Sequence, residues 1–378
     1  MNLRTRVVLA GIAGGIIGAG LLSGPAAASA SPTHHGAPRP VFVLANEASG
    51  NAVAVYNRGT DGTLTGAGRF ATGGNGGSLT GSVVDHLASQ GALTYDRNTH
   101  LLYAVNAGSN TVTVFAAVGD RLVRLQVIGT GGTFPVSVTV HGPFVYVLNA
   151  RDGGSIQGFV RVGLRLVRIP EWRRPLGLNA AASPEFVNTP GEVAFSPAGD
   201  HLIVTTKANG SAIDVFGVSI TGRPTHSPVV TQDASNVPFA VAFDRTGRLD
   251  VAEAGPNAVS AWVLHHDGSL TFVNRVATGG AATCWIVGNG SQLYVNNAGS
   301  ASVNTVDVTS GGLVNRATTT THGGTIDASI SGDGRNLYVQ TGATGTVDEF
   351  AIGSDGSLQS IGSVTVPGTV GGEGIASA

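Results

Sequence analysis

The sequence predicts an all-β fold, a seven-bladed β-propeller with four-stranded antiparallel blades. Three observations lead to this prediction. A strand–turn–strand unit recurs seven times at spacings of about 43 to 60 residues, which is the period of a propeller blade. Tight-turn signals separate the copies, and no stretch shows the periodicity of an amphipathic helix. The last residues of the chain have the pattern of a single inner strand, which would close the ring.

The recurring unit is an apolar strand that ends in a polar residue, then a turn of small residues, then an alternating strand. Clear copies are Val41–Tyr56 and Leu102–Phe115. The other five copies are Tyr146–Phe159, Ile203–Phe216, Asp250–Trp262, Tyr294–Val306 and Tyr338–Phe350. We expect each copy to form the second and third strands of a blade, counted outward from the axis.

Further strands are expected on both sides of these copies. Inner strands that end in a tight turn are predicted at Val193–Gly199, Val241–Gly247 and Ala328–Gly334. Outer strands are predicted after the hairpins at Asp61-Gly62, Asp267-Gly268 and Asp355-Gly356. Asp-Gly between two strands favours a tight turn in which both residues take positive φ.

The first copy has no inner strand ahead of Val41. The segment Gly371–Ser377 can supply that strand at the other end of the chain. We therefore expect the C-terminal strand to join blade one, which would close the ring and remove an exposed sheet edge.

The first thirty residues have the pattern of a signal peptide. Arg4 and Arg6 form a short basic region, Val7–Leu22 is apolar, and Ala26–Ala30 supplies small residues for cleavage. The predicted organisation is a signal peptide at 1–30, a short flexible linker at 31–40 and one propeller at 41–378. We expect a secreted, extracellular protein.

Composition restricts the partners. The chain has 57 glycines, 12% charged residues and a net charge of −2, which predicts no attraction to nucleic acid or to an anionic membrane. Cys284 is the single cysteine, so an intramolecular disulfide is impossible. We expect a monomer, with no nucleic-acid partner and no membrane contact once the signal peptide is removed.

Aligning the blades predicts a polar, net-acidic funnel at the centre of one face. The starts of the inner strands contribute one residue per blade: Ala92, Ser137, Glu192, Ala240, Cys284, Asp327 and Glu373. The second strands end on the same face. The candidate catalytic residues are Glu192 and Glu253. The candidate substrate-binding residues are Lys207, Asp327, Ser137, Asn106, Asn149, Asn297, Glu373 and Cys284.

Structural roles compete with these assignments. The strand-end asparagines also suit turns, because their side chains cap local backbone groups. Lys207 could form a salt bridge with Glu192 or Glu253 across the opening, or anchor a substrate carboxylate. Cys284 has no adjacent histidine and is also explained as a small residue packed beside Trp285. The scattered histidines and the missing haem-attachment motif predict no metal and no cofactor.

Several phrases resemble the lactonase-type seven-bladed propellers, which include 6-phosphogluconolactonase-like and 3-carboxymuconate cyclase-like proteins. The resemblance covers residues 41–377 and rests on Tyr103–Asn106, Tyr146–Asn149, Val193–Pro197 and the Asp-Gly-Ser-Leu hairpins. The phrases Phe134–Val138 and Ala282–Trp285 look like exported actinobacterial members.

The resemblance implies metal-free chemistry on a lactone, carried out by side chains around the central opening. Active members often carry histidine after proline at the inner-strand starts. This chain has Pro135-Val136, Pro190-Gly191 and Pro238-Phe239 there, so no catalytic histidine is transferred.

Two functions from different classes follow. The first is a secreted lactonase-like hydrolase for a small lactone or an acidic sugar derivative. In it Glu192 or Glu253 would activate water, and Lys207 or an arginine such as Arg151 would orient the substrate. The second is a non-catalytic extracellular propeller that binds a protein, a glycan or the cell wall.

Overall fold

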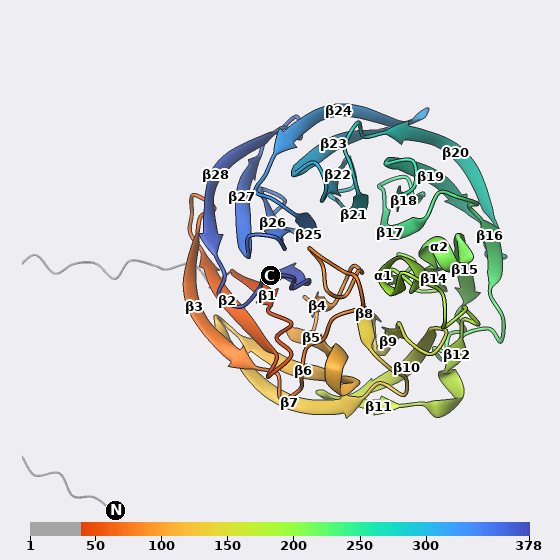
Figure 1. Ribbon diagram of the computed structural model, residues 1–378. Coiled ribbons are helices and arrows are strands. Elements are labelled where there is room, and N and C mark those ends of the chain that lie inside the picture. Colours follow the sequence, from red (N-terminus) through yellow and green to blue (C-terminus); the bar gives the residue numbers. More distant parts are fainter. Residues whose placement is uncertain (1–38) are drawn as a thin grey trace, which may run out of the picture. The chain divides into compact units, whose positions relative to one another are not determined.

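The structure is a computed structural model that describes residues 39–378, so the predicted signal peptide and most of the linker lie outside the described residues. Seven antiparallel sheets surround a central axis (Figure 1). Six have four strands each, and the sheet of blade three carries one additional short strand. The predicted seven-bladed propeller is therefore confirmed.

Each blade runs from an inner strand beside the axis to an outer strand on the rim. From blade one to blade seven, the inner strands are β29 (Ile375–Ser377), β4 (Leu93–Asp96), β8 (Pro135–His141), β13 (Val193–Phe195), β17 (Pro238–Phe243), β21 (Thr283–Gly288) and β25 (Thr325–Ile330). The second strands are β1 (Pro40–Leu44), β5 (Leu101–Asn106), β9 (Phe144–Asn149), β14 (His201–Thr205), β18 (Leu249–Glu253), β22 (Gln292–Asn297) and β26 (Asn336–Thr341).

The third and outer strands complete the blades. The third strands are β2 (Ala52–Arg58), β6 (Thr111–Val118), β10 (Ser155–Val162), β15 (Ala212–Gly217), β19 (Ala258–Leu264), β23 (Ser302–Thr309) and β27 (Thr346–Ile352). The outer strands are β3 (Leu64–Ala71), β7 (Arg121–Gly129), β11 (Arg165–Arg168), β16 (Val229–Gln232), β20 (Leu270–Ala277), β24 (Gly312–Thr320) and β28 (Leu358–Thr365). The additional strand β12 (Arg174–Pro175) pairs with β10.

The C-terminal strand closes the ring, as predicted. β29 pairs antiparallel with β1, with Val41 opposite Ser377 and Val43 opposite Ile375. The Ala378 amide also donates to the Pro40 carbonyl at 2.9 Å. Blade one is therefore assembled from both ends of the described chain, and no inner edge is left unpaired in it.

Hydrogen bonds between blades explain a tyrosine that recurs in the second strands. These buried side chains lie between neighbouring sheets, where a hydroxyl needs a partner. The hydroxyls of three of them donate to hairpin carbonyls of the following blade: Tyr146 to Gly222 at 2.6 Å, Tyr294 to Gly356 at 3.1 Å and Tyr338 to Gly62 at 2.7 Å. In blade five the same position holds Asp250.

The Asp-Gly hairpins differ from the predicted turn in one respect. Only the glycines take positive φ: 92° at Gly62, 85° at Gly268 and 83° at Gly356. The aspartates instead use their carboxylates as local acceptors; Asp61 Oδ1 accepts the Thr63 amide at 3.1 Å and the Thr63 hydroxyl at 2.8 Å. A side-chain turn of this kind favours Asp without requiring the left-handed conformation.

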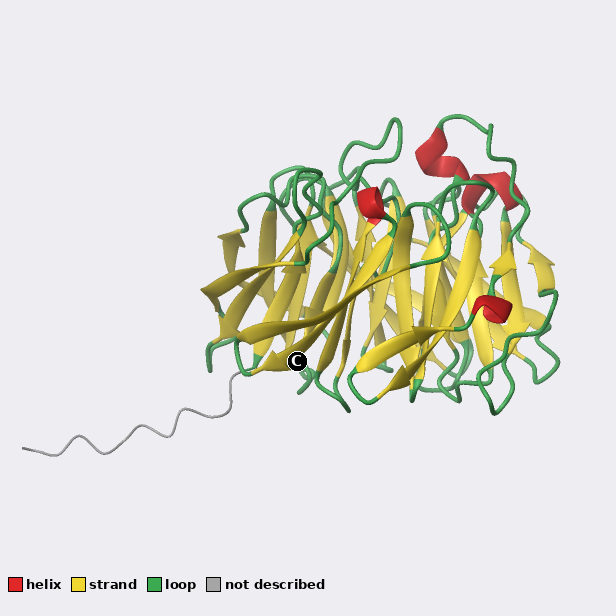
Figure 2. Ribbon diagram, turned by 90° about the horizontal axis from the view of Figure 1, so that it is seen from below, coloured by secondary structure: helices red, strands yellow, loops and turns green. Residues whose placement is uncertain are grey.

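The two faces of the disc differ. Inner strands begin on the face that we call the loop face, where long connections and short helical turns project (Figure 2). These turns are η1 (Ala107–Ser109), α1 (Glu185–Asn188) and α2 (Lys207–Gly210). Another turn, η2 (Pro170–Trp172), follows β11. Inner strands end on the opposite face, which we call the hairpin face because it carries the Asp-Gly turns.

Candidate functional site

The chain fills the loop-face end of its own axis. The long connection between β3 and β4 turns inward, and we call its residues 84–91 the axial loop; it belongs to the orange connection near the centre of Figure 1. The Ser89 hydroxyl donates to the Val136 carbonyl at 2.9 Å, and Trp285 Nε1 donates to the Ser89 carbonyl at 2.7 Å. The His86 amide donates to the Gly371 carbonyl at 2.9 Å. Contacts to blade three, blade six and the C-terminal segment hold this loop in place.

Gln90 is the central residue of the axial loop. Its Nε2 donates to Glu192 Oε2 at 3.2 Å and to the Val241 carbonyl at 3.4 Å. Its Oε1 accepts the Ile286 amide at 2.9 Å. One buried amide thus connects blades four, five and six, and its donor and acceptor are both satisfied.

Glu192 is a buried carboxyl beside this amide. Its Oε2 also accepts the Val241 amide at 2.7 Å, whereas Oε1 has no hydrogen-bond partner among the described residues. Burial raises the pKa of Glu192 to about 8, with a smaller contribution from the nearby charge of Asp327. At neutral pH the carboxyl is therefore largely protonated.

Asp327 and Glu373 form a carboxyl pair between blades seven and one. Their side chains share a hydrogen bond, which requires a proton on one of them. Burial raises both pKa values. Backbone and hydroxyl donors complete the pair: Glu373 accepts from Ser89 Oγ at 3.1 Å, and Asp327 Oδ1 accepts from the Ala328 amide at 2.9 Å.

Lys207 faces the axial loop. Its buried Nζ donates to the carbonyls of Ala88 and Phe186, both at 2.6 Å, and to Thr189 Oγ1 at 3.1 Å. Burial lowers its pKa to about 7, and the charge of Asp85 opposes that shift. Of the two roles that the sequence left open for Lys207, the salt bridge with Glu192 or Glu253 is not formed, because its donors are taken by the two long connections.

Asp85 is the axial-loop acid whose charge acts on Lys207. Burial raises the pKa of Asp85 to about 6, while the amides of Leu87 and Ser89, at 2.8 and 2.9 Å, lower it. The charges of Lys207 and Asp85 therefore stabilise one another, and Lys207 holds the loop through the Ala88 carbonyl.

Cys284 lies at the start of β21, in a bulge between Thr283 and Trp285. Its side chain is buried in an apolar cluster, and burial raises the pKa of the thiol to about 12. A thiol that stays protonated at neutral pH is a poor nucleophile. This environment supports the alternative stated in the sequence analysis, in which Cys284 is a small residue packed beside Trp285.

Other candidate residues lie within their own blades. Glu253 ends β18 and is paired with Arg275 of the outer strand β20, with Oε1 2.9 Å from Nη2. Its carboxylate therefore points away from Glu192. Asn106 Nδ2 donates to the hydroxyls of Thr111 and Thr113 at 3.0 and 2.9 Å.

The remaining strand-end and ring positions behave similarly. Asn297 Nδ2 donates to Asn304 Oδ1 at 2.7 Å, and Asn149 Nδ2 contacts the Ser155 carbonyl at 3.4 Å. These bonds support the turn-capping interpretation of the asparagines. Ser137 is buried, and its hydroxyl accepts the Val193 amide at 3.3 Å, which joins blades three and four.

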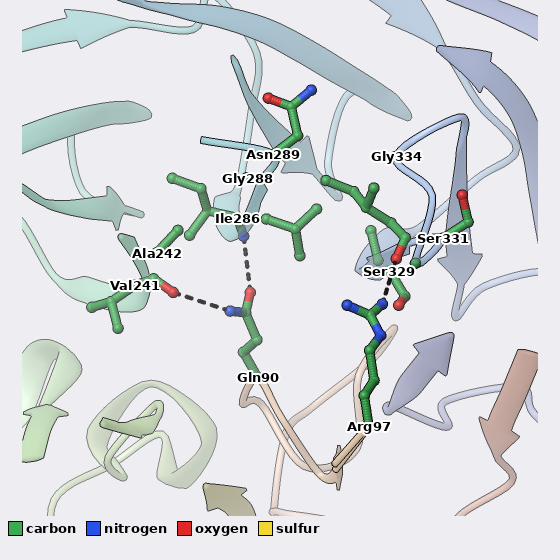
Figure 3. Close-up of a pocket in the computed structure, with 14 residues that line it drawn as sticks. Gln90, Arg97, Val241, Ala242, Ile286, Gly288, Asn289, Ser329, Ser331 and Gly334 are labelled. Carbon is green, nitrogen blue, oxygen red and sulfur yellow. Dashed lines mark hydrogen bonds between the residues drawn. The ribbon is translucent and has the colours of Figure 1, made fainter. Parts of the chain in front are cut away.

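The axis is open on the hairpin face. A cavity of about 530 Å³, the channel mouth, extends from that face to Gln90 (Figure 3). It is lined by the ends of β17, β21 and β25, with Arg97 at one side. Arg97 Nη2 donates to the carbonyls of Ile330 and Ser377 at 3.2 and 3.1 Å. A polar ligand could enter this cavity and reach the Gln90 amide.

Residues 39–378 contain no cluster of His, Cys, Asp and Glu side chains suited to a metal ion. The same part of the chain has no helix long and apolar enough to cross a bilayer.

The sequence did not single out Arg97, Ser89 or Gln90 as site residues. Ser89 and Gln90 lie in a connection outside the repeat, so no blade-to-blade alignment could place them. The only signal was the length of that connection and its position on the loop face.

The closed loop-face end of the axis predicts an unreactive thiol. Native protein should react with a thiol reagent far more slowly than denatured protein, because Cys284 is buried and protonated. Replacing Lys207 by Met removes three hydrogen bonds that hold the long connections, so the native reaction should become faster. Absorbance-monitored labelling of the single cysteine measures both rates; fast labelling of the native protein would contradict the closed axis.

Solved structures share this architecture over nearly the whole described chain. A candidate 6-phosphogluconolactonase from Bacteroides uniformis superposes with a TM-score of 0.74 at 16% identity, covering 91% of this chain and 100% of that one. A similar candidate from Bacteroides fragilis gives 0.68 at 18% identity, with coverages of 92% and 99%. The periplasmic gluconolactonase of Pseudomonas aeruginosa gives 0.69 at 16% identity, with coverages of 90% and 99%.

This chain has the fold of the lactonase-like propellers. No family model matches the sequence, and no curated protein matches it. At identities below one fifth, the likeness establishes the seven-bladed architecture, whereas chemistry depends on the side chains of this chain.

Proposed function

We propose that this propeller is a lactonase-like hydrolase that receives a small polar lactone in the channel mouth and uses Glu192 as its acid–base group. The observation that carries the proposal is the position of Glu192. It is a carboxyl with a strongly raised pKa, one amide away from the end of a polar cavity on the propeller axis. Perturbed carboxyls at the end of a central cavity are frequent acid–base groups.

The chemistry needs no metal. Ionised Glu192 would take a proton from water while the water oxygen attacks the lactone carbonyl. The bond between the carbonyl carbon and the ring oxygen then breaks, and the carboxyl returns the proton to that ring oxygen. The product is an open-chain hydroxy acid, which releases one proton to solvent at neutral pH. A carboxyl with a pKa near 8 can serve in both directions.

Two neighbours would control access and orientation. Gln90 separates the cavity from Glu192, so its side chain must rotate before a lactone carbonyl can approach the carboxyl. Arg97 lines the cavity, where its guanidinium can hold a carboxylate or phosphate on the substrate. An acidic sugar lactone is therefore the expected substrate class.

A hydrolysis screen tests the proposal. The mature protein would be assayed on sugar and aliphatic lactones with a pH indicator. Glu192→Gln should lower kcat/KM by about 100-fold or more, and the wild-type rate should rise with pH up to about 8. Glu253→Gln is the matched control: it removes a buried carboxylate off the axis and should keep the activity.

Two results would contradict this assignment. Full activity in Glu192→Gln would exclude the carboxyl. An equal loss in Glu192→Gln and Glu253→Gln, when melting curves show that both variants are folded, would show that the loss is not specific to Glu192.

A binding platform is the second candidate, favoured by the sealed loop-face end of the axis. Most axial donors and acceptors are already paired with the axial loop, which leaves little free chemistry there. No turnover on any lactone, together with retention on cell-wall or glycan fractions, would support this function. Export through the predicted signal peptide at residues 1–30 remains part of both proposals.

A further inference from the structure

Blades two and three share a hairpin sequence that differs from the Asp-Gly-Ser-Leu type. The residues from Val118 read Val-Gly-Asp-Arg-Leu-Val-Arg-Leu, and those from Val162 read Val-Gly-Leu-Arg-Leu-Val-Arg-Ile. Each begins at the end of a third strand and continues along the outer strand, β7 or β11. The same mixture of aliphatic and arginine side chains is therefore repeated on two adjacent blades.

The aliphatic side chains of this repeat are unusually exposed. At the hairpin tips, Val118 is 62% exposed, Val162 63% and Leu164 52%. Further along the outer strands, Val123, Val127 and Val167 also face solvent. Branched aliphatic residues clustered at two hairpin tips are typical of a contact surface rather than of isolated exposed positions.

The arginines on the same surface lack ionic partners. This surface carries six arginines: Arg121, Arg124, Arg161, Arg165, Arg168 and Arg173. None of the six forms an ion pair within residues 39–378. Of the twelve arginines elsewhere in this range, seven are paired with a carboxylate. Asp120 and Glu171 are the only acids in the two segments, 118–129 and 161–173, and Asp120 is engaged by Asn57 Nδ2 at 2.9 Å.

The two outer strands form one surface. β7 and β11 lie side by side on the rim (Figure 1). Gln126 of β7 joins them, because its Nε2 donates to the Leu166 carbonyl at 3.0 Å and its Oε1 accepts the Leu166 amide at 2.7 Å. We call the six exposed aliphatic residues and the six arginines the arginine–valine patch.

We propose that the arginine–valine patch docks the propeller onto a bilayer that carries anionic phospholipids. The arginines would contact the headgroup phosphates, and the aliphatic hairpin tips would enter the interface between them. A soluble polyanion would use the arginines alone, and would leave the exposed aliphatic tips without a role. The net charge of −2 had predicted no such attraction, because it averages this cationic surface with the acids of the other blades.

Vesicle sedimentation tests the proposal with the full mature protein. Binding is expected to vesicles of phosphatidylcholine mixed with phosphatidylglycerol, and not to phosphatidylcholine alone. Arg165→Gln with Arg168→Gln should weaken binding about tenfold or more, and added salt should weaken it as well. Val162→Ser with Leu164→Ser should weaken binding while leaving the salt dependence in place.

Controls come from outside the patch. Val314→Ser replaces a valine of β24 that is comparably exposed, and Arg335→Gln removes an exposed arginine from blade seven. Both should bind like the wild type. No binding to the anionic vesicles would overturn the proposal. A second result would also overturn it: the Val162→Ser, Leu164→Ser variant binds the vesicles as strongly as the wild type, and dextran sulfate displaces both proteins equally. This result would indicate that the partner is a soluble polyanion.

Discussion

Deleting residues 368–378 is expected to abolish cooperative folding of the propeller. The deletion removes β29, exposes the edge of β1, and takes away Glu373, the partner of Asp327. It also removes Ile375 and Ala376 from the core. Domain stabilities total about 5–15 kcal/mol, and the loss of an inner strand together with its closure contacts can consume that margin.

A circular permutant provides the matched control. Residues 368–378 would be placed before Arg39 through a short linker, which is possible because Ala378 and Pro40 are hydrogen-bonded at 2.9 Å. This chain keeps every strand and every blade contact, so it should melt cooperatively near the wild-type temperature. Calorimetry compares the three proteins, and an unchanged melting temperature in the deletion would refute closure by the C-terminal strand.

The fold could be predicted because each blade repeats the same local chemistry. Apolar second strands, small-residue turns and Asp-Gly hairpins recur in one order, and each is decided by residues near one another in sequence. The missing inner strand ahead of Val41 and the segment at Gly371–Ser377 then completed the ring. The ring positions at the inner-strand starts followed from the same periodicity, which is why Glu192, Asp327 and Glu373 do lie buried at the axis.

The occupancy of the axis could not be predicted in this way. Gln90 and Ser89 belong to a connection outside the repeat, so their bonds to blades three to six have no signature in the spacing. For Glu253 the position could be predicted but the direction of the side chain could not. The residue ends a second strand, as the repeat predicts, but its carboxylate pairs with Arg275 on the outer strand of the same blade.

The buried carboxyls predict that the protein is less stable at neutral than at mildly acidic pH. Burial raises the pKa of Asp85 to about 6, and of Glu192 and Asp250 to about 8. Their stabilising contribution is complete below the unfolded pKa values near 4 and is lost as the pH rises through the folded values. Carboxylates in exposed ion pairs, such as Glu185 with a pKa of about 2, lose their contribution only at lower pH.

The free energy of unfolding should therefore fall by about 6 kcal/mol between about pH 5 and pH 7, because each carboxyl that is protonated only in the folded state costs about 1.4 kcal/mol per pH unit. Lys207 adds nothing in this window, since its folded pKa of about 7 leaves it protonated in both states below that pH. Above pH 7 it opposes the trend, because the unfolded chain then binds its proton more tightly. Urea unfolding at a series of pH values measures the slope.

Asp250→Asn isolates one contribution. Neither carboxylate oxygen of Asp250 has a hydrogen-bond partner in the described structure, so its ionisation is opposed by burial and by the charge of Asp244. The variant should unfold like the wild type at about pH 4 and below, and should become increasingly more stable than the wild type as the pH rises to 8, because the amide cannot ionise. Asp61→Asn, at an exposed hairpin whose carboxylate has a lowered pKa, should leave the slope between pH 5 and pH 7 unchanged. A wild-type stability that rises over this window would show that the buried carboxyls are ionised in the folded protein.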